Sequence, residues 1–82
     1  MNFQERSLYL ELLAQTHADL KQMAESHRYL AEYYYAVGHT KTAILQINLA
    51  QKEKNLDPYL NAILEERLRF FMEEEKQRRE NE

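Results

Sequence analysis

Three histidines are the first side chains to consider for chemistry, because imidazole serves both as a metal ligand and as a proton carrier. They are His17, His27 and His39, and the chain contains no cysteine. His17 and His27 fall on different predicted helices, and His39 falls in a predicted turn. No two of them have the i, i+4 spacing that places two ligands on one helix face. The sequence therefore predicts neither a metal site nor a cofactor, and the histidines are expected to lie in the core, in a groove or in solvent.

Glutamate clusters are the second source of chemistry, since paired carboxylates can act as general acid and general base. The two clusters are Glu65-Glu66 and Glu73–Glu75. Acid–base catalysis needs carboxylates that point into an apolar cleft, where burial shifts their pKa values. Basic residues instead lie beside both clusters, at Arg67, Arg69 and Lys76, as is typical of a solvated helix surface. We therefore expect no catalytic residue, and the chain is predicted not to be an enzyme.

Tyrosines gather in one short segment at Tyr29 and Tyr33–Tyr35. Three consecutive helical residues span about 200°, so Tyr33, Tyr34 and Tyr35 cannot all face one core. Tyr34 fits the core, and at least one of its two neighbours is expected to reach a groove or an interface, although both could pack on flanking helices instead. Tyrosine suits a binding surface because it offers a large contact area and a hydroxyl group. The residues predicted to contact a partner are His27, Arg28, Tyr33 and Tyr35.

The elements that position these residues follow from the composition. The chain has 82 residues with one glycine and one proline, which is too few turn residues for a sheet protein, so the fold is predicted to be all-α. The net charge of −3 has the wrong sign for a general nucleic-acid-binding protein. The longest run without Asp, Glu, Lys or Arg is Thr42–Gln51, which is too short to span a membrane.

Four antiparallel helices are predicted, over residues 5–20, 23–37, 41–54 and 58–77. Asn2 and Glu5 could form a capping box, which would start the first helix earlier. Residues 1–77 would form a single domain, and residues 78–82 a charged, frayed tail. Gly38 is expected to adopt the left-handed conformation after the second helix, Thr40 to cap the third, and Asp57-Pro58 to open the fourth. No turn residue marks Lys21-Gln22, so local signals also permit one long bent helix across that position.

Apolar spacing predicts which side of each helix faces inward. The first helix would bury Leu8, Leu12, Leu13 and Leu20, and the second Met23, His27, Leu30, Ala31 and Tyr34. The third would bury Ala43, Ile44, Ile47 and Ala50, with Leu45 and Leu49 to one side. The fourth would bury Leu60, Ile63, Leu64, Leu68 and Phe71, which leaves Phe70 or Met72 pointing elsewhere.

Residues 30–50 resemble a tetratricopeptide repeat (TPR). The pattern consists of Leu30-Ala31, Tyr34, Gly38, Ala43-Ile44 and Ala50, in which small residues of one helix receive larger residues of the next. The chain departs from the pattern at His27, where a large apolar residue is usual, and at Ile47, where an aromatic is usual. Its closing proline also comes late, as Pro58. A weaker match to the same pattern lies one helix earlier, at Leu10, Leu13-Ala14 and His17. The chain would therefore hold about one and a half repeats and a capping helix. The resemblance favours a turn at Lys21-Gln22 over one long helix.

A second resemblance covers residues 8–71 and is to the C-terminal region of bacterial zinc metallopeptidases that carry such repeats behind an HExxH domain. It rests on Leu30–Tyr35, Gly38, Ala43-Ile44 and Glu66-Arg67-Leu68. This chain has no HExxH motif, so the resemblance implies the non-catalytic part of such a protein, with the catalytic domain missing here. It also implies a periplasmic or outer-membrane-associated location, where the repeats dock substrates or partner proteins.

The function expected from these observations is non-catalytic protein–protein interaction, in which a peptide or helix of a partner lies across the second helix. Two alternatives stay open. The chain could be a free-standing small repeat adaptor with a chaperone-like role, or a structural bundle that associates with itself, for example as a homodimer. Sequence alone does not identify the partner or the face that binds it.

Overall fold

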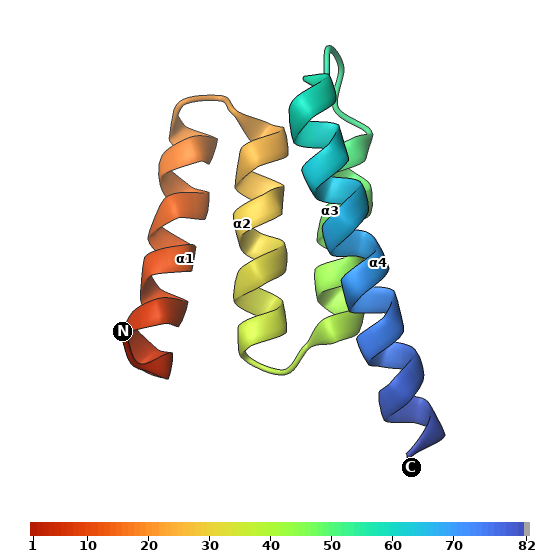
Figure 1. Ribbon diagram of the computed structural model, residues 1–82. Coiled ribbons are helices and arrows are strands. Elements are labelled where there is room, and N and C mark those ends of the chain that lie inside the picture. Colours follow the sequence, from red (N-terminus) through yellow and green to blue (C-terminus); the bar gives the residue numbers. More distant parts are fainter. Residues whose placement is uncertain (82) are drawn as a thin grey trace.

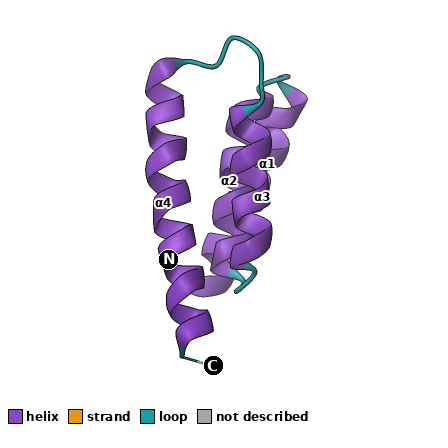
Figure 2. Cartoon of the chain, turned by 90° about the vertical axis from the view of Figure 1, so that its right-hand side faces the viewer, coloured by secondary structure: helices purple, strands orange, loops and turns teal. Residues whose placement is uncertain are grey.

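The computed structural model describes residues 1–81, and all of its regular elements are helices. They are α1 (Phe3–Asp19), α2 (Met23–Ala36), α3 (Thr40–Gln51) and α4 (Pro58–Glu80). The all-α prediction and the prediction of four helices are therefore confirmed for the described part of the chain. Figure 1 shows α1, α2 and α3 side by side as one antiparallel layer. Figure 2 shows α4 packed against one face of that layer.

Helix α1 begins two residues earlier than predicted because a capping box closes its first turn. The side chain of Asn2 accepts a hydrogen bond from the Glu5 amide at 2.8 Å, and the Glu5 carboxylate accepts one from the Asn2 amide at 3.2 Å. The two bonds satisfy amides that a helix start otherwise leaves unpaired.

The turn at Lys21-Gln22 is present, so α1 and α2 are separate helices. Lys21 adopts the left-handed conformation with φ 63°, and the Gln22 amide donates to the His17 carbonyl at 2.8 Å. The α2–α3 turn has the same geometry: Gly38 has φ 87°, and the His39 amide donates to the Tyr34 carbonyl at 2.8 Å. Both are Schellman turns, which satisfy the last carbonyls of a helix.

Helices α3 and α4 differ from the predicted bounds. Helix α3 ends at Gln51, three residues before the predicted end at residue 54. Thr40 was predicted to cap α3, but it is the first residue of that helix and is buried, while His39 takes the cap position without a side-chain bond. The Schellman turn at Gly38 is followed only by His39, so α3 already begins at Thr40. Helix α4 continues to Glu80 and includes residues 78–80 of the predicted tail, while residue 82 lies outside the described residues. Asp57 caps α4 and Pro58 opens it, as predicted.

The main core lies between α2, α3 and α4. Its fully buried members include Ala31, Ala43 and Ile47 from the layer and Leu64 and Phe71 from α4. The inward stripes predicted for the third and fourth helices are confirmed. The stripe predicted for the first helix is wrong: Leu8, Leu12 and Leu20 are exposed, and the residues of α1 that are buried are Leu10 and Ala14.

Candidate protein interface

A groove of about 490 Å³ runs between α1 and α2. Small side chains of the two helices, Ala14, Ala18 and Ser26, lie between them, and Ala14 and Ser26 are almost fully buried. The Ser26 hydroxyl donates a hydrogen bond to the Ala14 carbonyl at 2.8 Å, which holds the two helices close together. Large side chains of α2 and polar side chains of α1 complete the lining: Met23, His27, Leu30, Tyr33, Tyr34, Glu11 and Gln15. This surface is called the α1–α2 groove below.

The aromatic wall of the α1–α2 groove is held in place by contacts within the layer. The rings of Tyr33 and Tyr34 meet edge to face with their centroids 5.4 Å apart, and Tyr34 stacks on His39 at 6.4 Å. The His27 ring is fixed through its Nδ1 atom, which lies 2.8 Å from Oε1 of Gln46 on α3. A pre-ordered wall of this kind loses little side-chain freedom when a partner binds.

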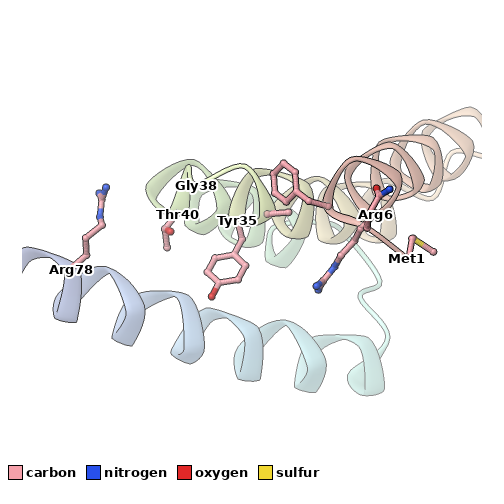
Figure 3. Close-up of a pocket in the computed structure, with 9 residues that line it drawn as sticks. Met1, Arg6, Tyr35, Gly38, Thr40 and Arg78 are labelled. Carbon is pink, nitrogen blue, oxygen red and sulfur yellow. The ribbon is translucent and has the colours of Figure 1, made fainter.

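A second pocket, of about 520 Å³, lies between the start of α1, the α2–α3 turn and the end of α4. Figure 3 shows Arg6 and Tyr35 pointing from the layer toward α4, with Arg78 on the other side of the opening. Arg78 donates to the Glu75 carboxylate at 3.0 Å, and Lys41 lies 3.8 Å from the same oxygen. The Lys41–Glu75 pair joins α3 to α4, whereas the Arg78–Glu75 pair lies within α4.

The four residues predicted to contact a partner do not form one surface. His27 and Tyr33 line the α1–α2 groove, whereas Tyr35 lies on the side of α2 that faces α4. The Tyr35 hydroxyl donates to the Glu74 carboxylate at 2.6 Å, and this hydrogen bond raises the pKa of Tyr35. Arg28 lies over the Tyr29 ring at 5.2 Å.

Sequence reasoning did not assign Leu30 or Tyr34 to the groove, because both fit the predicted core stripe. It also did not use the pair Ala14 and Ala18, whose i, i+4 spacing places two small side chains on one face of α1. Two small residues at this spacing on one helix face could have predicted a shallow depression there, because they leave room between larger side chains.

Helix α4 is fixed to α2 by a paired arginine and glutamate. Arg67 donates to Glu32 through both Nε, at 2.7 Å, and Nη2, at 2.9 Å. The same guanidinium lies over the Phe70 ring at 4.6 Å and over the Phe71 ring at 5.0 Å. This arrangement covers the α4-facing side of α2 and leaves the side that carries Leu30 and Tyr33 to the α1–α2 groove.

The histidines and glutamates considered for chemistry lie apart from one another. The Nδ1 atom of His17 lies 2.7 Å from the Leu13 carbonyl oxygen, and the His17 ring packs on the Tyr29 ring with the centroids 5.0 Å apart. Within residues 1–81 no group of three or more potential metal ligands comes together. Among the glutamates, Glu66 pairs with Arg69 at the surface, whereas Glu75 is buried, which the sequence did not indicate.

Comparison with protein-family models, with curated proteins and with solved structures finds no match for this chain. None of the helices in the described residues is long and apolar enough to cross a membrane. The candidate interface is therefore characterised by its own geometry: a groove between two helices with a floor of small residues and a wall of aromatic and apolar ones.

Proposed function

We propose that this chain is a non-catalytic protein–protein interaction module, which binds a peptide or helix of a partner in the α1–α2 groove. The observation that carries the proposal is the groove itself, with an ordered aromatic wall beside small floor residues. Large, rigid aromatic side chains beside a low floor are typical of surfaces that accept the apolar side chains of a partner.

A TPR-type arrangement of helices is part of this proposal. Three small residues of the pattern, Ala31, Ala43 and Ala50, are fully buried where neighbouring helices meet. The left-handed residues also recur at a constant interval, at Lys21, Gly38 and Asn55. That interval is 17 residues, half of the 34 residues that make up one such repeat, and it supports a repeated helix-and-turn unit.

The parent protein is part of the proposal as well. A C-terminal position behind a zinc-metallopeptidase domain, in a periplasmic or outer-membrane-associated protein, rests on the resemblance of residues 8–71 alone. In such a protein the module would dock a substrate or an assembly partner for the catalytic domain. Reading the natural gene upstream of this segment tests that part directly, because the proposal requires an HExxH motif there.

Selection from a random peptide library on the immobilised chain tests the binding function. Peptides that bind should lose at least about tenfold in affinity, which is about 1.4 kcal/mol, when Tyr33 is replaced by alanine. They should also lose affinity for Ala18→Trp, which fills the groove without removing a contact. Tyr59→Ala is the matched control, because Tyr59 is an exposed tyrosine on α4, far from the groove. Peptides that respond equally to all three variants, or a failure to select any, would show the proposal to be wrong.

A further inference from the structure

The two walls of the α1–α2 groove differ in chemical character. The α2 wall includes the large side chains of Leu30 and Tyr33. The α1 wall includes Glu11 and Gln15, and the Gln15 side-chain amide donates a hydrogen bond to the Asp19 carboxylate at 2.9 Å. Among the described residues, no lysine or arginine lines the groove. The groove therefore offers an apolar and aromatic surface on one side and a carboxylate on the other.

Glu11 lies across the groove from the aromatic end of α2. The hydrogen bond from Ser26 to the Ala14 carbonyl fixes the register of the two antiparallel helices. One helical turn from that contact, away from the α1–α2 turn, Glu11 comes opposite Leu30, and Tyr33 follows on the next turn of α2. The Glu11 side chain is exposed, and within the described residues it forms no hydrogen bond or ion pair.

A carboxylate and an aromatic ring on facing walls are suited to a lysine or arginine side chain. The cation is attracted both by the negative charge of Glu11 and by the face of the Tyr33 ring. The edge-to-face contact of Tyr33 with Tyr34 involves at most one face of either ring, so one face of Tyr33 is not covered by Tyr34. The aliphatic stem of the same side chain packs on apolar surface such as Leu30.

Other kinds of peptide fit these walls less well. An entirely apolar peptide would cover the Glu11 carboxylate without supplying a partner for it, and removing an unpaired charge from water is costly. An acidic peptide would place like charges side by side and would also be repelled by a chain of net charge −3. A basic residue removes both penalties.

We propose that the occupant of the α1–α2 groove is a peptide that carries a lysine or arginine close to a large apolar residue, an inference that rests on the proposed function. The basic side chain lies between Glu11 and Tyr33. The apolar side chain lies over Ala14 and Ala18, which follow Glu11 along α1 by about 4.5 and 10.5 Å. This separation corresponds to at most about three residues in an extended peptide, or to i, i+4 or i, i+7 in a helical one.

Peptides selected from the random library on the immobilised chain provide the test. They should share a lysine or arginine at one fixed position. Replacing that residue with norleucine, which keeps an unbranched aliphatic chain without the charge, should weaken binding by about fivefold in fluorescence anisotropy. The same replacement should have little effect on binding to Glu11→Gln. Glu80→Gln is the matched control, because it removes one exposed carboxylate from α4 and should preserve the fivefold difference.

Charge reversal gives a second measurement. Selection on Glu11→Lys should yield aspartate or glutamate at the position where the unmodified chain selects a basic residue. Peptides that lose affinity for Tyr33→Ala and Ala18→Trp but show no preference for a basic residue would overturn the basic partner and leave the proposed function standing. An equal effect of norleucine on the unmodified chain and on Glu11→Gln would do the same. Failure to select any peptide would overturn both.

Discussion

The pair formed by Glu32 and Arg67 should be a main source of the stability of α4 on the layer. Both guanidinium nitrogens that take part lie within 2.9 Å of a carboxylate oxygen, so the contact is bidentate. Its side chains are 17% and 32% exposed, which places it between a surface pair and a buried one. Removing either partner leaves a half-buried charge without its counterpart.

The expected magnitude follows from that intermediate burial. Exposed ion pairs contribute about 0.2–1 kcal/mol, whereas hydrogen bonds to charged groups contribute about 1.5–3 kcal/mol. We expect Arg67→Ala to lower the free energy of unfolding by about 2–3 kcal/mol, because the variant also loses the contacts of the guanidinium with Phe70 and Phe71. The coupling between Glu32 and Arg67 should amount to about 1–2 kcal/mol.

A double-mutant cycle measures this coupling. Urea unfolding followed by circular dichroism gives the free energy of unfolding for Glu32→Gln, Arg67→Ala, the double variant and the parent chain. Arg67→Lys should behave more like Arg67→Ala than like the parent chain, because an ammonium group cannot form the bidentate pair. A coupling below about 0.5 kcal/mol, or full rescue by lysine, would refute the view that this geometry stabilises α4.

Three further predictions concern α4 and the turns. Phe71→Ala should lower the free energy of unfolding by about 3–5 kcal/mol, since Phe71 is a fully buried large side chain. Gly38→Ala should lower the free energy of unfolding by about 1 kcal/mol, because Gly38 has a positive φ; a Cβ there would meet no neighbour, so the backbone conformation is the cause. Lys21→Gly should raise the free energy of unfolding by a similar or smaller amount, because Lys21 also has a positive φ. Urea unfolding measures both changes. The hydrogen bond from the Arg78 guanidinium holds the pKa of Glu75 below its ordinary value of 4.5. The ionised Glu75 carboxylate therefore stabilises the fold above pH 4.5, and this stabilisation is lost as the pH falls through the lowered pKa. Glu75→Gln should therefore flatten the loss of stability below pH 4.5, measured by urea unfolding at several pH values.

Local signals were sufficient for most of the fold. Gly38, Asp57 and Pro58 act at helix ends through their own backbone preferences, so their roles could be predicted from the residue type. The turn at Lys21 could not, because lysine has no preference for the left-handed conformation. Tertiary packing of α1 on α2 imposes that conformation, and a single sequence does not express it.

The candidate groove was only partly predictable, for a geometric reason. The predicted stripe of α1 used its most apolar residues, but the structure buries Ala14 and leaves Leu12 exposed. Small residues allow two helices to approach closely, so the close contact forms on the alanine side and the leucines remain outside. Hydrophobicity alone ranks leucine above alanine and therefore selects the wrong face. The same reversal that leaves Leu12 exposed brings Ala14 against α2 and so forms the α1–α2 groove.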